Sequence, residues 1–189
     1  EINDLNRKAQ IELDALSHED KLLWWLDNRS VYQTEHDASV RIAMLSSLKP
    51  SYKVDINAIE QLTITHQKLS SQINIRLSSD RESRKAIELL GNQLSEFNIA
   101  TSTSKNKNQT HVLKVDSERR RNKVGDAYIS TLVSNIKIVN KKSKTVSRSE
   151  IISTGNSVTS YKYADEGAAR HFDEQIKEKG IWTALGLLK

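Results

Sequence analysis

The amino-acid sequence predicts an α+β fold, in which a helical hairpin or three-helix unit, residues 1–70, precedes a β-α-β-β-β-α domain, residues 71–189. Before residue 70, apolar residues recur at three- and four-residue steps, the spacing of one helix face. Residues 72–78, QINIRLS, instead alternate strictly, which is typical of a half-buried strand. Runs rich in Val, Ile and Thr follow at 110–117 and 127–140, before a final amphipathic helix. Helices packed on one face of a mixed sheet would satisfy this order of elements.

Capping signals divide the first half into helices. The first apolar stripe consists of Ile2, Leu5, Ala9, Leu13 and Leu16. SHED at 17–20 and TEHD at 34–37 each have the form of a helix start, with Ser or Thr as the cap and an acidic residue three positions later. The second helix is expected to end before Pro50, the only proline, and a third runs toward Leu69. Such helices bury their stripes against one another.

The second half combines two helices with extended runs. Residues 79–97 predict an amphipathic helix, and NIATSTS at 98–104 predicts a short extended run. KKSK separates the runs at 127–140 and 145–154, which predicts a hairpin. Residues 160–180 predict the last long helix, ended by glycine. Its expected inward residues are Tyr163, Ala164, Ala168, Phe172 and Ile176, and those of the helix at 79–97 are Ala86, Leu90, Leu94 and Phe97.

The composition excludes several classes of function. The 189 residues contain no cysteine, which excludes disulfides, thiolate metal sites and cysteine nucleophiles within them. No apolar run approaches the ~18 residues of a membrane span. The chain begins at Glu1 without methionine, so we expect a processed or trimmed protein, with any signal peptide or lipid-bearing cysteine upstream. Membrane association is then expected only through an anchor absent from this sequence.

A strand–glycine–helix junction at 151–172 has the order of elements found in phosphate-binding sites. Gly155 is not followed by further glycines at dinucleotide spacing, and the glycine-lysine pair of a phosphate loop is missing. We therefore predict a structural junction, with Gly155 as a turn residue and Ser157 or Ser160 as the cap of the last helix.

No motif indicates catalysis or metal binding. The five histidines, His18, His36, His66, His111 and His171, are scattered, and none form the i, i+4 pair that places two imidazoles on one helix face. Nothing resembles a nucleophile elbow. The sequence therefore predicts a protein that is not an enzyme and has neither catalytic nor metal-binding residues and no cofactor.

Basic residues are concentrated in two segments, 104–125 and 137–148, and the net charge is +5. Basic patches attract nucleic acid or anionic lipid headgroups, although lysines at strand ends also discourage edge-to-edge pairing of sheets. The candidate anion-binding residues are Arg119, Arg120, Arg121, Lys123, Lys141 and Lys142. Single-strand recognition would require aromatic residues among these charges, and few are present.

Two apolar segments are candidates for a partner interface. Adjacent tryptophans cannot place both rings on one helix face, so one of the pair at 24–25 is expected to contact the second half or a partner. The apolar tail at 181–188 requires a surface on which to dock. The residues assigned to this interface are Trp24, Trp25, Ile181, Trp182, Leu185 and Leu187.

The stretch EIISTGNSVTSYKYADEGAARHFDEQI, read after THVLKVDSERRRNKVGDAYISTLVSNIKIVN, resembles the domain of the bacterial twenty-kilodalton surface-lipoprotein family. It is more distantly similar to the curli channel lipoprotein and to the amino-terminal domain of the Tol-system propeller protein. The residues that carry the resemblance are Gly155, Ser157, Ala164, Ala168, Ala169 and Phe172. In these folds a strand-helix-strand unit leads to a long hairpin, and an alanine-rich helix packs across the sheet.

The resemblance implies an exported protein of the bacterial cell envelope, facing the periplasm or the outer membrane, that binds and assembles rather than catalyses. Its partners would be envelope proteins or further copies of the same chain. The alternative hypothesis is a nucleic-acid-binding domain that uses the basic hairpin at 104–148.

Overall fold

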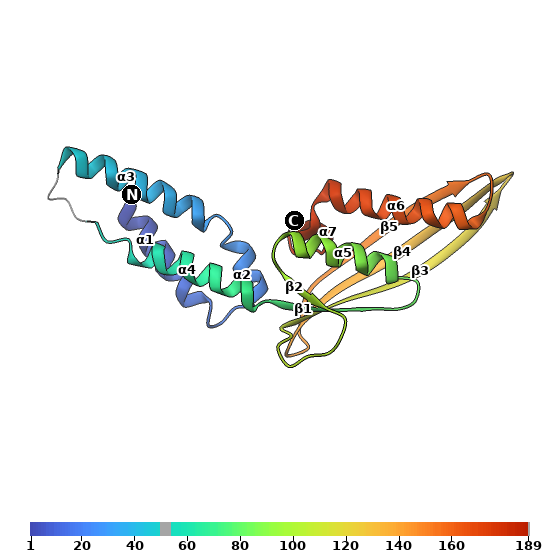
Figure 1. Cartoon of the computed structure of the whole chain (residues 1–189), viewed down its shortest axis with the longest axis horizontal. Coiled ribbons are helices and arrows are strands. Elements are labelled where there is room, and N and C mark those ends of the chain that lie inside the picture. The colour runs from blue at the N-terminus through green and yellow to red at the C-terminus, as the bar shows by residue number, and fades with distance from the viewer. Residues whose placement is uncertain (50–53, 189) are drawn as a thin grey trace. The chain divides into compact units, whose positions relative to one another are not determined.

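The computed structural model describes residues 1–49 and 54–188. The chain forms two compact units, Glu1–Ile73 and Asn74–Lys189, and each is considered by itself (Figure 1). The first unit is helical and the second combines a mixed sheet with helices, so the α+β prediction is confirmed. No helix in the described part of the chain is long and apolar enough to cross a membrane.

The first unit contains four helices within its described residues, not the two or three expected. They are α1 (Ile2–Ala15), α2 (Lys21–Asp27), α3 (Val31–Leu48) and α4 (Asn57–Gln72). The expected end of a helix before Pro50 agrees with the end of α3, although Pro50 itself lies outside the described residues.

The two predicted start signals in this unit have different outcomes. The chain does break at 17–20, but the cap of α2 is Asp20, whose carboxylate accepts the backbone N–H of Leu22 at 3.1 Å. The predicted start at 34–37 is wrong, because α3 continues through it. The Thr34 hydroxyl donates to the Ser30 carbonyl, at 3.2 Å, and so acts inside the helix instead of capping it.

Trp24 and Trp25 lie in the core of the first unit. Their side chains are almost fully buried, and both rings approach His66, with centroid distances of 6.5 and 5.3 Å. The Trp24 indole N–H donates to the Glu12 carbonyl at 2.6 Å. Both rings therefore pack within this unit against a histidine of α4, whereas one of them was expected to contact the second half or a partner.

The sheet of the second unit has the strand order β2-β1-β3-β4-β5. Its strands are β1 (Asn74–Ser79), β2 (Ala100–Ser102), β3 (His111–Val124), β4 (Ala127–Asn140) and β5 (Thr145–Ser157). β1 pairs in parallel with β2 and β3, whereas β3, β4 and β5 form an antiparallel ribbon. β2 lies within the short extended run predicted at 98–104, which the predicted order of four strands did not count as a strand.

Two long helices, α5 (Arg84–Glu96) and α6 (Tyr161–Lys179), cover one face of this sheet (Figure 1). Hydrogen bonds join both to the same face: the Ser83 hydroxyl donates to that of Ser117 at 2.7 Å, and Ser130 donates to a carboxylate on α6. The predicted inward residues of the two helices are buried, with two exceptions. Phe97 is 43% exposed and Tyr163 is 52% exposed.

Gly155 is a strand residue within β5, so its assignment to a turn is wrong. A Cβ atom at this position would lie 2.1 Å from the Ala164 carbonyl oxygen and 2.2 Å from the Ala168 nitrogen. The glycine is required because the backbone of α6 crosses β5 at closer range than any side chain permits.

Neither predicted serine caps α6. The Ser157 hydroxyl accepts the backbone N–H of Thr159 at 3.0 Å, two residues later, which shapes the turn before the helix. Ser160 occupies the residue before α6, but among the described residues its side chain makes no capping hydrogen bond.

The tail folds back on its own unit through the short helix α7 (Ile181–Ala184). The Trp182 ring meets Phe97 edge to face at a centroid distance of 5.2 Å, and the Ser149 hydroxyl donates to the Ala184 carbonyl at 2.5 Å. Leu185 is fully buried and Leu187 is half-buried. Ile181, Trp182 and Leu185, which were predicted to form a partner interface, are therefore buried in the core of their own unit, because the tail packs its apolar side chains against that unit.

Candidate functional site

The predicted basic patch is divided between the two ends of the antiparallel ribbon. Arg119 pairs with Leu132 of β4, toward the β3–β4 turn, whereas Lys141 and Lys142 follow the other end of β4. About 30 Å of extended strand separates the two groups. They therefore belong to different surfaces.

At the β3–β4 end, ion pairs bind the arginines to neighbouring carboxylates. Arg119, only 16% exposed, lies 2.9 Å from Glu82 and 3.0 Å from Asp165. Arg121 lies 2.7 Å from the other oxygen of Asp165. Ser130 completes the cluster by donating to Asp165 at 2.6 Å. These contacts join β3, β4, α6 and the segment just before α5.

The electrostatics of this cluster favour the ionised carboxylate of Asp165. Burial opposes ionisation, but hydrogen bonds from Arg121 and Ser130 and the nearby guanidinium groups outweigh it, so the pKa of Asp165 lies below its usual value. The hydrogen bond with Asp165 correspondingly raises the pKa of Arg121. A carboxylate stabilised in this way is a poor proton acceptor.

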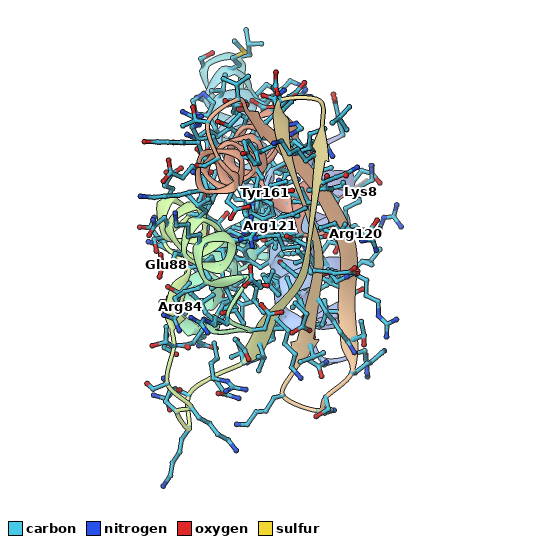
Figure 2. All side chains as sticks on the ribbon, turned by 90° about the vertical axis from the view of Figure 1, so that its right-hand side faces the viewer. Lys8, Arg84, Glu88, Arg120, Arg121 and Tyr161 are labelled. Atoms are coloured by element: carbon cyan, nitrogen blue, oxygen red, sulfur yellow. The ribbon has the colours of Figure 1, made fainter. Side chains whose placement is uncertain are left out.

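Strand alternation separates neighbouring arginines onto opposite faces of the sheet. Figure 2 shows Arg121 beside Tyr161 on the face that carries α6, and Arg120 on the opposite face. The guanidinium carbon of Arg121 lies 5.8 Å from the Tyr161 ring centroid. Arg120 instead pairs with Glu118 of its own strand at 2.8 Å. The triplet at 119–121 is therefore not one continuous basic surface.

The cavity beside this cluster, between α5 and α6, has a volume of about 300 Å³. Its lining combines apolar residues with charges of both signs. These residues are Glu82, Lys85, Ala86, Leu89, Arg119, Arg121, Leu132, Lys162, Asp165, Glu166, Ala169 and Phe172. The arginines and Asp165 already compensate one another, so the cavity does not concentrate charge of one sign.

The other face of the ribbon is open within the second unit and has an ordered charge pattern. Lys114, Lys137 and Arg148 lie in one cross-strand row. The next row, two residues along each strand, contains Asp116, Asn135 and Glu150. The third row contains Glu118, Val133 and Ile152. Like charges directly opposite one another destabilise a sheet, so the cationic row is a feature that folding alone does not explain.

The free edge of β5 is protected by α6. The Thr154 backbone N–H donates to His171 Nδ1 at 3.0 Å, and Gln175 donates through Nε2 to the Ile152 carbonyl at 2.8 Å. Backbone groups satisfied in this way are not free to pair with another strand.

Among the described residues, no group of three or more His, Asp or Glu side chains could hold a metal ion.

His66 is enclosed by aromatic rings, and its Nε2 lies 2.9 Å from the Trp25 carbonyl oxygen. Burial lowers its pKa, against the opposing effect of that hydrogen bond.

Comparison with known proteins gave no matching family model and no matching curated protein. Solved structures that are similar to part of the chain include a minor lipoprotein from Acinetobacter baumannii (14% identity, 58% of this chain and 91% of that one, TM-score 0.47). They also include the PelC dodecamer from Paraburkholderia phytofirmans (12% identity, 55% and 85%, TM-score 0.39). A third is lipoprotein GNA1162 from Neisseria meningitidis (12% identity, 56% and 99%, TM-score 0.37). At these identities and TM-scores, the similarities do not decide the function.

Sequence reasoning did not select four cations that line the same cavity as Lys141. Three of them, Lys105, Lys107 and Lys114, lie in the basic segment at 104–125 but were not named as anion-binding residues. The fourth, Arg76, was assigned only to the polar side of its strand by the alternating pattern of β1. The contribution of β1 depends on its parallel pairing with β3.

Proposed function

We propose that the chain is a non-enzymatic interaction module of the bacterial cell envelope, whose second unit assembles with another copy through the open face of its sheet. The envelope location, in the periplasm or at the outer membrane, is supported by the resemblance to the surface-lipoprotein domain. The order of β1, α5 and the strands that follow, with Gly155 under an alanine-rich α6, agrees with that resemblance.

The charge pattern of the open face carries the proposal of self-association. The cationic row of Lys114, Lys137 and Arg148 lies about 7 Å from the acidic row of Asp116 and Glu150. A two-fold axis between the rows places the cations of each copy over the acids of the other. The surface is thus complementary to itself, as a closed dimer requires.

Apolar residues adjoin these charged rows. Val133 is half-buried and Ile152 is 51% exposed, although both lie in the middle of their strands. Covering them in a dimer would remove apolar surface from water, which stabilises association. Association by strand addition at β5 is disfavoured, since His171 and Gln175 occupy its backbone groups. The geometry therefore favours packing of face against face.

Two complementary charge variants test this proposal. In the first, Lys114→Glu, Lys137→Glu and Arg148→Glu make both rows acidic; in the second, Asp116→Lys and Glu150→Lys make both rows basic. Sedimentation velocity of the whole chain is expected to show a dimer for the wild type, monomers for each variant, and a dimer again for their equimolar mixture, because the unlike rows then face each other.

A control variant carries three equivalent changes on the helical layer, Arg84→Glu, Arg170→Glu and Lys179→Glu, and is expected to remain dimeric. Figure 2 shows Arg84 on α5, away from the open face. A wild type that stays monomeric at high concentration would overturn the proposal. So would a mixture of the two variants that contains only monomers.

A further inference from the structure

The loop 103–110 and the turn 141–144 lie at the same end of the sheet (Figure 1). Residues of both line a basic cavity on the open face of the sheet. Its volume is about 560 Å³. Five of the residues that line it are cations: Arg76, Lys105, Lys107, Lys114 and Lys141. No carboxylate lines it within the described part of the chain, in contrast to the cavity between α5 and α6.

The floor of this cavity is a row across three strands. Arg76 pairs in register with Val112, which in turn pairs with Val139. Both valines point to the open face, yet they are only 7% and 9% exposed. The loop 103–110 and the turn 141–144 therefore enclose this end of the sheet and create a recess instead of a flat surface.

Two polar atoms in the recess are buried without a partner. Arg76 Nε and Gln109 Oε1 are both inaccessible to solvent, and neither has a hydrogen-bond partner among the described residues. A buried guanidinium nitrogen left unsatisfied is costly, and Arg presents its donors in a fork that matches phosphate oxygens. The Gln109 amide can rotate to present its NH₂ group to an anion. Arg76 and Gln109 are therefore the lining residues whose side chains we expect to contact a bound ligand directly.

The positive charges that line the recess favour an anionic ligand. Lys114 belongs to the cationic row and meets the acidic row of the second copy in the proposed dimer. The other four cations, Arg76, Lys105, Lys107 and Lys141, lie outside that row, and no carboxylate lines the recess among the described residues to balance their repulsion. Cations on mobile stems and one planar Arg fork suit a group with several charged oxygens more than a single carboxylate. We propose that this recess binds a phosphate group, supplied either by the headgroup of an anionic phospholipid or by a small phosphorylated compound.

The surroundings of the recess favour a phosphate group over a nucleic-acid strand. No aromatic side chain lines it, whereas proteins that bind single strands stack bases on such rings. Lys142 and Lys144 are exposed on the same turn as Lys141 and add to the positive charge of that turn.

Binding of the whole chain is measured by co-sedimentation with vesicles of phosphatidylglycerol and phosphatidylcholine, and by titration with inorganic phosphate and pyrophosphate, at 150 mM salt. The test variant is Lys105→Gln, Lys107→Gln, Lys141→Gln, and its control, with the same charge change, is Arg84→Gln, Arg170→Gln, Lys179→Gln. We expect binding at least 10-fold weaker in the test variant and unchanged in the control. Arg76→Gln is expected to weaken binding as well.

The arms of the experiment distinguish the two sources of phosphate. Binding to phosphatidylglycerol vesicles without binding to phosphate or pyrophosphate identifies a lipid headgroup, whereas saturable binding of the free anions identifies a small phosphorylated ligand. Absence of both would overturn the proposal. It would also be overturned by equal losses in the test and control variants, or by tighter binding of a single-stranded oligonucleotide that the test variant loses. Because none of the three test lysines lies in the cationic row, the oligomeric state is expected to be unaffected.

Discussion

Replacement of Gly155 by alanine tests the closest approach between α6 and the sheet. The added Cβ would meet the Ala164 carbonyl oxygen at 2.1 Å, the Ala168 nitrogen at 2.2 Å and the Gly167 carbonyl carbon at 2.6 Å. All three are backbone atoms, so no side-chain rotation relieves the overlap. The helix must move outward by about 1 Å to restore ordinary contact, which loosens close packing along its buried face.

The expected cost follows from this geometry. Overpacking a close-packed site destabilises a protein by typically 1–3 kcal/mol, and the backbone contacts here place Gly155→Ala at about 3 kcal/mol. For a unit of this size, that change lowers the midpoint of thermal unfolding by roughly 10 °C. The helix has little freedom to yield, because Ala164, Ala168, Phe172 and Ile176 are all buried along it.

Circular dichroism gives the unfolding midpoint, and amide hydrogen exchange along α6 shows whether the loss is local to the helix. Asn156→Ala, the neighbouring position on the open face of β5, is the matched control and is expected to change stability little. At an unstrained strand position, Gly→Ala is instead stabilising by about 0.5–1 kcal/mol. A Gly155→Ala protein that is as stable as the wild type, or more stable, would therefore refute the close-approach argument.

Two further predictions concern ionisable groups. Because burial lowers the pKa of His66, the unfolded chain takes up a proton more readily, and the free energy of unfolding of the first unit should fall as pH drops below about 6.5, by at most about 1.4 kcal/mol per pH unit. Urea unfolding followed by tryptophan fluorescence at pH 7.5 and 5.5 measures this fall. The difference between the two pH values should be smaller in His66→Gln than in the wild type, and the same as in the wild type in the control His36→Gln. Asp165→Asn should cost about 2 kcal/mol at pH 7, since it removes the partner of Arg119 and Arg121. Because the pKa of Asp165 is lower in the folded protein than the ordinary 3.8, its stabilising contribution is lost as pH falls below 3.8 and through the folded-state value, so the difference in the free energy of unfolding between variant and wild type should shrink between pH 7 and pH 3; a difference that stays the same over this range would contradict the ion-pair account.

Local patterns accounted for the type of most elements. Strict alternation at 72–78 and the β-branched runs after residue 110 correspond to β1, β3 and β4, and the three- and four-residue apolar steps correspond to helices. Element boundaries were less well predicted where a polar side chain had two possible roles. Thr34 has the residue type of a cap, but its hydroxyl donates to the Ser30 carbonyl one turn earlier, and α3 continues through it.

The candidate sites depended on contacts that no local pattern contains. The arginines at 119–121 form a basic cluster in the sequence, but strand alternation and the carboxylates of Glu82 and Asp165 divide and neutralise it. Arg76 belongs to the basic recess only because β1 pairs in parallel with β3.

By itself, the sequence determined the fold class and the position of the last helix, because periodicity is a property of neighbouring residues, and its composition showed that these 189 residues contain no cysteine. Only the tertiary structure decided that Gly155 lies under a helix, that the tail at 181–188 packs on its own unit, and which charges remain uncompensated. Those outcomes depend on which strands and helices become neighbours in space, and the energies of close packing and of ion pairing extend over only a few ångströms.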